Sequence, residues 1–534
     1  MNASKIAKIR YLSGGDCSIS SVCYCAPLYA DVSEDITLPE YISDVRRVLT
    51  SDSTVSFCEC SVSDSKIECE GKIAVNVLLY TDSGEVKGYT VSLPYSASSQ
   101  SIDGDHPISG YLCLPSIEQA SAKLTNSRKI SVKCRVKIDT RAYCRIDSFP
   151  TVSGGVKEED ESYVERDTDS IEVMRMASSQ SESFSLSDDI ELENTRHQIE
   201  DILCCRASAL GCTVREAEGG VVCDGEMETT VFYTDVDKKV QSITRRQRYS
   251  ATCDIESVGQ GCEYAANLYV HDIRAKSSKN SFGENRIIEL DVSGSLGVFS
   301  AVNAISEITR DAYSTEHECR NCFADFRCPA LLRLGEVSFT QNVSKSLSEI
   351  SAKAPESIVC PTVSIRNAKS GYDSDRARAY VGATAEISVL ARDGDGEIYP
   401  INFSAPVKYD LDGAGGQNTD SLCFASVSNV SARFDSSKIY CDFNVSATVF
   451  STSESDRHIL CECILEGEKE KNGGKKSAMT VCYGKAGERL WDIAKHYSTT
   501  VDAIAAVNSI SSDCLESDSV MIIPQKKKGV TRII

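Results

Sequence analysis

Histidine and cysteine side chains between positions 317 and 328 have the types and spacing that a zinc site requires. The four residues that offer one imidazole and three thiolates are His317, Cys319, Cys322 and Cys328. Structural zinc favours tetrahedral sets of nitrogen and sulfur ligands. The 534 residues include 25 cysteines, however, and at this density about one Cys-x-x-Cys pair arises by chance. Because no second pair of this kind is present, we interpret the segment as a thiol-rich joint and predict no metal site.

A short acidic run at residues 393–397, Asp-Gly-Asp-Gly-Glu, resembles the start of a calcium-binding loop. Related runs at residues 82–85 and 235–237 also lie between two segments of alternating apolar residues. Such a context is typical of a hairpin turn. We therefore expect turns at all three positions and no calcium site.

Motifs for nucleophilic catalysis are missing from the sequence. The six histidines fall in unrelated contexts, and there is no Gly-x-Ser-x-Gly, His-Glu-x-x-His or phosphate-binding loop. Carboxylates in so acidic a chain are usually solvated. We predict a non-enzymatic protein with no cofactor.

The net charge of −21 argues against nucleic-acid binding, which normally uses a basic face. Residues 479–534 hold seven Lys/Arg and six Asp/Glu, so the acidity lies before them, and such a tail is compatible with docking on a partner. No run approaches the roughly 18–20 apolar residues of a membrane span. Residues 1–10 lack the apolar stretch of a signal peptide. We expect a cytoplasmic protein with free thiols.

Cysteine also recurs at alternate positions. The three Cys-x-Cys pairs are Cys23/Cys25, Cys58/Cys60 and Cys461/Cys463. In a strand, both members of each pair would point to one face.

Three segments of the chain repeat one pattern: a glycine, alternating apolar residues, an acidic turn and a second alternating segment. The copies start at Gly71, Gly225 and Gly382, which are 154 and 157 residues apart. A further alternating segment follows in each copy, starting at Ile130, Ile288 and Ile439. Period-two alternation broken by Gly/Asp/Ser turns predicts half-buried antiparallel strands.

The predicted fold class is therefore mainly β. We expect three tandem, sandwich-like domains at residues 1–152, 162–310 and 328–465. Acidic or charged joints at 153–161 and 310–327 would separate them. A flexible linker at 466–478 would then lead to a small βααβ module at 479–524.

The C-terminal segment resembles a LysM domain. The residues in register with that family's pattern are Gly487, Leu490, Trp491, Ile493, Ala494, Tyr497, Val501, Ile504, Asn508, Ile523 and Pro524. The sequence departs from the pattern at Glu488, at Arg489 in place of a small hydroxyl, and at Gly484 in place of a branched apolar residue.

This resemblance implies a groove between two loops that binds N-acetylglucosamine polymers or, in this chain, a protein. The implied binding residues are Gly487, Glu488, Arg489, Leu490, Val507, Asn508, Ser509 and Ile510. Arg489 would either obstruct a sugar or meet an acidic protein surface. Trp491, the only tryptophan, would pack inside the module or serve as a ligand platform.

The whole arrangement resembles the SipL-like spore coat morphogenetic proteins, which carry tandem SPOCS domains and a C-terminal LysM domain. The sequences Leu-Pro-Glu-Tyr at residues 38–41 and Leu-Pro-Tyr at residues 93–95 fit the SPOCS style. The resemblance implies a scaffold in the mother-cell cytoplasm that anchors the spore coat to the forespore surface. Its implied partners are the stage IV sporulation protein A-like coat ATPase and other coat proteins. A peptidoglycan-binding LysM protein is the alternative.

Overall fold

The computed structural model describes residues 18–524 except 64, 103–105, 148–150, 154–162, 256–259, 351, 412–418 and 470–478. Nearly all of the predicted joint at 153–161 and most of the linker at 466–478 therefore lie outside the described residues, as do residues 1–17. The described part is mainly β, as the sequence predicted, and its two helices are short and close to the C-terminus. None of its helices has the length and apolar character needed to cross a membrane.

Strands β1 to β7 form a first unit made of two facing sheets. In one sheet β1, β2 and β6 all pair with β7, and the other sheet has the order β3-β4-β5. The strands are β1 (Ser18–Cys25), β2 (Leu28–Thr37), β3 (Val45–Ser63), β4 (Lys66–Thr81), β5 (Val86–Ser98), β6 (Ile108–Asn126) and β7 (Lys129–Asp147).

Strands β9 to β15 form a second unit of the same design. Strands β9, β10 and β14 pair with β15, and the facing sheet is β11-β12-β13. The strands are β9 (Val164–Gln180), β10 (Phe184–Glu191), β11 (Ile199–Ala217), β12 (Gly220–Asp235), β13 (Val240–Cys253), β14 (Glu263–Lys279) and β15 (Asn285–Ser314).

Strands β16 to β21 form the third unit, in which one long strand replaces the two short ones that open the other units. The sheet β16-β21-β20 faces the sheet β17-β18-β19. The short strand β8, which follows the first unit in the chain, pairs in parallel with β21. The strands are β8 (Thr151–Ser153), β16 (His317–Ser346), β17 (Ser357–Asp373), β18 (Arg378–Arg392), β19 (Ile398–Leu411), β20 (Thr419–Phe434) and β21 (Lys438–Glu468).

The predicted alternating segments are the central strands of these sandwiches. In β7 every second residue from Ile130 to Ile138 is at most 4% exposed, and these side chains pack against Ile73 and Val75 of β4 in the facing sheet. Period-two burial places one face of each strand between the sheets while the other carries polar residues. The alternation in β15 and β21 is buried in the same way.

Each acidic run is a hairpin turn, as predicted. The Asp393 carboxylate accepts hydrogen bonds from the backbone N–H groups of Asp395 and Glu397, at 3.1 and 2.9 Å. Asp235 makes the matching pair of bonds in the second unit. The carboxylate oxygens that would face a calcium ion instead organise the turn.

Most of the predicted joint at residues 310–327 is strand, and the boundary between the second and third units is a short turn within it. Strand β15 continues to Ser314, and β16 starts at His317 after a tight turn. The charges that suggested a linker are paired across neighbouring strands, Arg310 with Asp169 at 3.6 Å and Arg320 with Glu466 at 2.9 Å. Charged residues that pair across neighbouring strands therefore gave this segment the composition of a linker.

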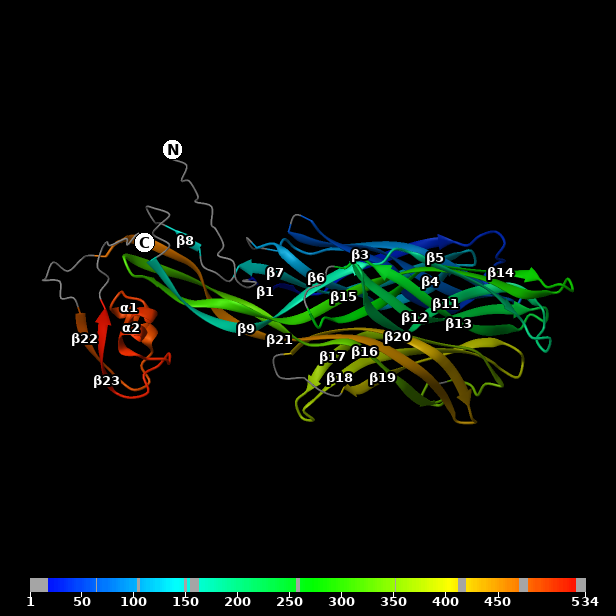
Figure 1. Ribbon diagram of the computed structural model, residues 1–534. Coiled ribbons are helices and arrows are strands. Elements are labelled where there is room, and N and C mark those ends of the chain that lie inside the picture. Colours follow the sequence, from blue (N-terminus) through cyan, green and yellow to red (C-terminus); the bar gives the residue numbers. More distant parts are fainter. Residues whose placement is uncertain are drawn as a thin grey trace.

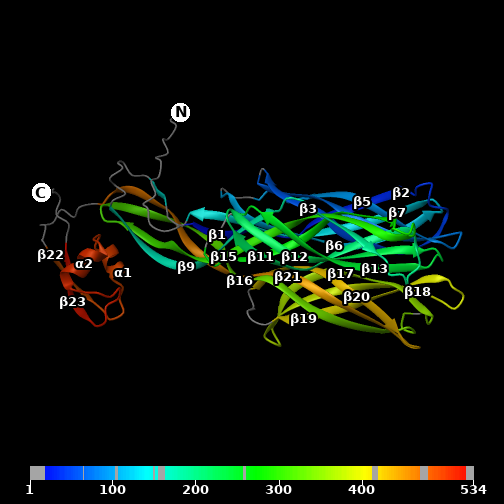
Figure 2. The same cartoon turned by 45° about the vertical axis from the view of Figure 1, so that its right-hand side comes forward.

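The three units share buried cores and therefore form one continuous body. One shared cluster draws equivalent residues from each sheet of three strands, including Val86, Val240 and Ile398 just after the acidic turns. A second cluster joins Leu112, Met176 and Leu334 with other apolar residues of all three units. Figures 1 and 2 show the units side by side in one elongated body.

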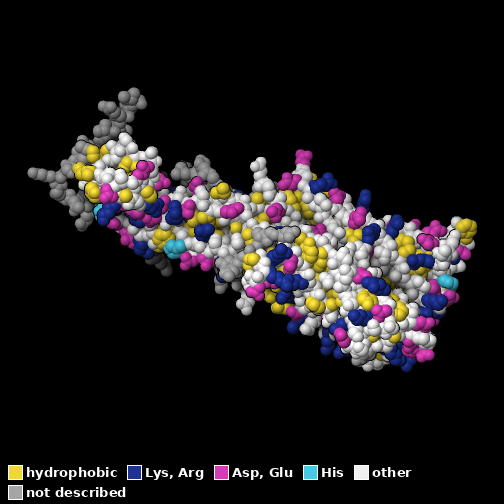
Figure 3. Space-filling view, turned by 90° about the horizontal axis from the view of Figure 1, so that it is seen from below, with side chains coloured by type: hydrophobic (Ala, Val, Ile, Leu, Met, Phe, Trp, Pro, Cys, Tyr) yellow, Lys and Arg dark blue, Asp and Glu magenta, His cyan; other side chains and the backbone are white. Residues whose placement is uncertain are grey.

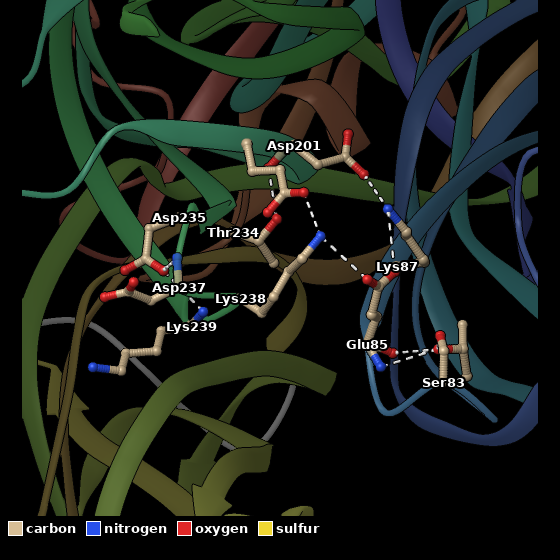
Figure 4. A network of polar contacts seen from close by, with 11 residues as sticks. Ser83, Glu85, Lys87, Asp201, Thr234, Asp235, Asp237, Lys238 and Lys239 are labelled. Atoms are coloured by element: carbon tan, nitrogen blue, oxygen red, sulfur yellow. Dashed lines mark hydrogen bonds and ion pairs between the residues drawn. The ribbon is translucent and has the colours of Figure 1, made fainter. Parts of the chain in front are cut away.

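Ion pairs extend the contact between the first two units (Figure 4). Lys87 of β5 pairs with Asp201 of β11 at 2.9 Å, and Lys238 after β12 pairs with Glu85 at 3.1 Å and also with Glu200. The β4–β5 turn and the β12–β13 turn are thus joined by ion pairs at the edge of the shared apolar core.

The C-terminal module has the predicted βααβ order. It lies at one end of the body, beside the ends of β9, β15, β16 and β21 (Figures 1 and 2). In the space-filling view it forms the narrow end of the molecule, and acidic and basic side chains are mixed over the visible face (Figure 3). Its elements are β22 (Met479–Gly484), α1 (Leu490–His496), α2 (Val501–Asn508) and β23 (Ser519–Pro524).

Candidate functional site

Two short helices and a two-stranded sheet build the C-terminal module around a small apolar core. Helices of seven and eight residues are marginal on their own and depend on packing. Thr500 caps α2, its hydroxyl accepting a hydrogen bond from the Ala503 N–H at 3.1 Å. The core side chains are Leu490, Ile493, Ala494, Ile504, Leu515, Met521 and Ile523.

Gly484 departs from the LysM pattern for a packing reason. A Cβ atom at this position would lie 2.3 Å from the Leu515 Cδ1 atom and 2.6 Å from the Met521 Cε atom. Larger neighbours therefore fill the space that a branched side chain would take.

The first predicted loop precedes α1 and is held by backbone hydrogen bonds. The Gly487 N–H donates to the Leu515 carbonyl at 2.8 Å, and the Leu515 N–H donates to the Glu488 carbonyl at 3.0 Å. Gly487 has a φ of +84°, which favours glycine. Gly487 and Glu488 are exposed, whereas Leu490 is part of the core.

The second predicted loop follows α2 and contains a structural asparagine. The Asn508 amide donates to the carbonyls of Ile504 and Ile522 and accepts from the Ile522 N–H, each at 2.8 Å. Asn508 therefore ties α2 to β23 and has little capacity left for a ligand. Val507 and Ser509 are exposed, and Ile510 is half-buried against the core.

These features agree with a family match over residues 485–524, which fit the model of the LysM domain. This segment is a LysM domain. No curated protein and no solved structure matches the chain. The βααβ order predicted from the resemblance is confirmed within the described residues.

Arg489 of the LysM domain faces the chain's own body. Its guanidinium donates to the Asp167 carboxylate of β9 at 2.7 Å, and Asp167 is only 14% exposed. Arg489 thus pairs with a carboxylate of the same chain, whereas both roles considered for it concern a ligand outside the chain.

Trp491 packs between the LysM core and the body. Its ring meets Tyr313 of β15 edge to face with centroids 4.8 Å apart, and its Nε1–H donates to the Asp311 carboxylate at 2.9 Å. Lys495, one turn further along α1, pairs with the same carboxylate at 2.6 Å. The Tyr313 hydroxyl completes the contact by donating to the Thr499 carbonyl at 2.7 Å. Trp491 is therefore a packing residue.

Asp167, Asp311 and Tyr313 are the functional residues that the sequence did not reveal. We call this group, together with Arg489, Trp491, Lys495 and Thr499 of the LysM domain, the docking face. The net charge of the tail gave no signal for them, because four of its seven cations lie at residues 526–532, outside the described residues.

The residues considered for zinc at positions 317–328 do not converge. They lie along the extended strand β16, where the nine steps from Cys319 to Cys328 span about 30 Å. Cys319 instead lies at the docking face beside Cys463 of β21. A hydrogen bond from the Cys463 thiol lowers the pKa of Cys319 to about 6 against the opposing effect of burial, with help from a backbone hydrogen bond at Ser314 and from Lys469 and Lys495.

Proposed function

We propose that this chain is a non-enzymatic scaffold whose LysM domain docks on proteins. The observation that carries the proposal is the docking face. Arg489, in the loop that LysM domains use for sugars, here pairs with the Asp167 carboxylate. Lys495 of α1 pairs in the same way with the Asp311 carboxylate. Charge complementarity of this kind selects an acidic protein surface.

The rest of the chain suits a scaffold role. Three sandwiches with shared cores form a long, continuous body that holds the LysM domain at one end (Figure 1). The resemblance to SipL-like proteins suggests the setting: spore coat assembly, with the LysM domain anchoring coat material to the forespore surface in the mother cell. The proposed partners are a stage IV sporulation protein A-like ATPase and other coat proteins.

Co-immunoprecipitation from sporulating cells tests this function. The full chain should capture the ATPase, and a chain without residues 479–534 should not. Arg489→Thr removes a cation of the docking face and should weaken capture while the domain stays folded, whereas Val507→Asp changes an exposed loop residue outside that face and should not. Equal capture of the ATPase by the full and shortened chains would contradict the proposal.

A second candidate function, binding of N-acetylglucosamine polymers, is favoured by the family match at residues 485–524. Gly487 and Glu488 of the first loop and Val507 and Ser509 of the second remain exposed beside the docking face. Sedimentation of the chain with purified peptidoglycan or chitin decides between the two ligands. Protein that stays in the supernatant removes the glycan function.

A further inference from the structure

Three cysteine side chains meet inside the first unit, and a fourth, Cys58, lies beside one of them. The Sγ atoms of Cys60, Cys69 and Cys113 all lie within 4.8 Å of one another. Cys60 Sγ is 2.6 Å from Cys69 Sγ and 3.7 Å from Cys58 Sγ. Cys58, Cys69 and Cys113 are buried and Cys60 is half-buried, so the cluster lies in the core with one member near the surface.

The register of the strands explains the convergence. Cys58 and Cys60 are two residues apart on β3 and point to the same face, as the spacing predicted. Cys69 of β4 lies directly opposite Cys60, and Cys58 lies opposite Gly71. Cys113 belongs to β6 in the facing sheet, where it lies opposite Thr140. Both sheets of the sandwich therefore supply thiols to one point.

A hydroxyl group of the facing sheet helps to hold the strand that carries Cys60. Tyr111 orients the strand that carries Cys60 by donating its hydroxyl hydrogen to the Cys60 carbonyl at 2.7 Å. Outer hydrogen bonds of this type hold metal ligands in place.

We propose that Cys58, Cys60, Cys69 and Cys113 form a structural site for a zinc ion. Tetrahedral sets of four sulfurs select zinc or iron–sulfur centres, and a single Zn²⁺ needs no further inorganic component. With zinc–sulfur bonds of about 2.3 Å, the sulfurs of a tetrahedron are about 3.8 Å apart. The separation of Cys58 and Cys60 already fits, and Cys60 and Cys69 need to move apart by about 1 Å. Cys58, which lies outside the group of three close sulfurs, needs to turn towards Cys69 and Cys113. Binding releases the remaining thiol protons to solvent.

A disulfide between Cys60 and Cys69 is the competing chemistry. Their positions in register would permit it, but it would leave Cys58 and Cys113 as two buried thiols with no role. A zinc ion accounts for all four residues and for the link between the two sheets. Cys60, half-buried, provides the side from which the ion enters.

The second unit offers an internal control at the same place in its fold. Cys212 lies opposite Gly225 and Cys223 lies opposite Val214, as Cys58 lies opposite Gly71 and Cys69 opposite Cys60. Val214 thus occupies the position of Cys60, so the second unit lacks the thiol that lies opposite Cys69 in the first unit. Cys212→Ser removes a cysteine of matched environment outside the proposed site.

Metal analysis of the full chain tests the proposal. Protein purified under reducing conditions, incubated with Zn²⁺ and dialysed against a weak chelator should retain one zinc per chain by elemental mass spectrometry. Cys60→Ser and Cys113→Ser should each weaken zinc binding by more than about 100-fold, beyond the loss caused by outer-sphere changes. Cys212→Ser should retain zinc like the unchanged chain.

Cobalt substitution in the unchanged chain keeps the test independent of how the variants fold. Co²⁺ should give the sulfur-to-metal charge-transfer and tetrahedral ligand-field bands of a thiolate site, and Zn²⁺ should bleach them. Three results would overturn the proposal: an unchanged chain that binds no zinc, with or without a Cys60–Cys69 disulfide in its peptide map; a cobalt spectrum without thiolate bands; or full zinc retention in folded Cys60→Ser and Cys113→Ser.

Discussion

The three β units and the LysM domain are attached to the molecule in different ways. The units are joined by two buried apolar clusters to which all of them contribute. The LysM domain meets the body through the ring contact between Trp491 and Tyr313 and through polar pairs at Asp167 and Asp311. Hydrogen bonds to Thr499 and Ser498 complete the contact. Apolar burial is worth far more than half-exposed ion pairs. The body should therefore fold as a whole, while the docking face can open without unfolding either part.

The largest effect should come from the shared core. Phe232 is 3% exposed and lies where the three units meet, so Phe232→Ala should lower the free energy of unfolding by about 3–5 kcal/mol. Denaturant unfolding should show all three units lost in one transition. Phe282→Ala is the matched control, because Phe282 is 86% exposed. Independent transitions of the units would break the comparison.

Trp491→Ala should have a large effect that is confined to the LysM domain. Removal of a buried ring costs about 3 kcal/mol, which is enough to unfold a module of this size. Hydrogen exchange should become fast throughout α1 and α2 while the exchange of β7 and β21 stays slow. Val507→Ala, at a side chain 47% exposed, should change neither. Faster exchange in the body would mean that the two regions are one cooperative unit.

Asp311→Asn should loosen the docking face without unfolding the LysM domain. The change removes the charge that pairs with Lys495, a half-exposed pair worth about 1 kcal/mol. Small-angle X-ray scattering should show a more extended particle, and amide exchange within α1 should stay slow. Asp325→Asn removes a carboxylate from β16 whose partner is His458, away from the LysM domain, and should leave the scattering unchanged.

Cys319 should report the docking face through its reactivity. Because its pKa is lowered to about 6, the thiolate fraction and the alkylation rate should rise as pH increases through about 6 and then level off near pH 7. Cys25, whose pKa is raised above 9.0 by desolvation, should react only at higher pH. Lys495→Met removes a cation near Cys319, so its alkylation curve should move to higher pH. Identical curves for Cys319 and Cys25 would contradict the assignment.

Local patterns made much of this fold predictable. Alternation identified the central strands of each sandwich, and the LysM pattern identified the small βααβ module with its two helices. The joint at residues 310–327 was predicted too long, because charges paired across neighbouring strands have the same composition as charges in a linker. Asp167 and Asp311 had no local signature, since their role depends on which ends of strands meet the C-terminal domain.

The four cysteines of the first unit show the same limit from another side. The spacing of Cys58 and Cys60 placed both on one face of a strand. Cys69 joins them only through the β3–β4 register, and Cys113 only through the packing of one sheet on another. Sequence spacing carries the first relation but not the other two.

The paired strands β16 and β21 also have a mechanical meaning. They run side by side from His317–Glu468 at the LysM end to Ser346–Lys438 at the other, over about 100 Å. A pull on the LysM domain along this direction would load the ladder in shear, with many hydrogen bonds strained at once. Such a geometry resists force better than strands that separate one bond at a time. The β16–β21 ladder should therefore stay paired when force is applied through the LysM domain.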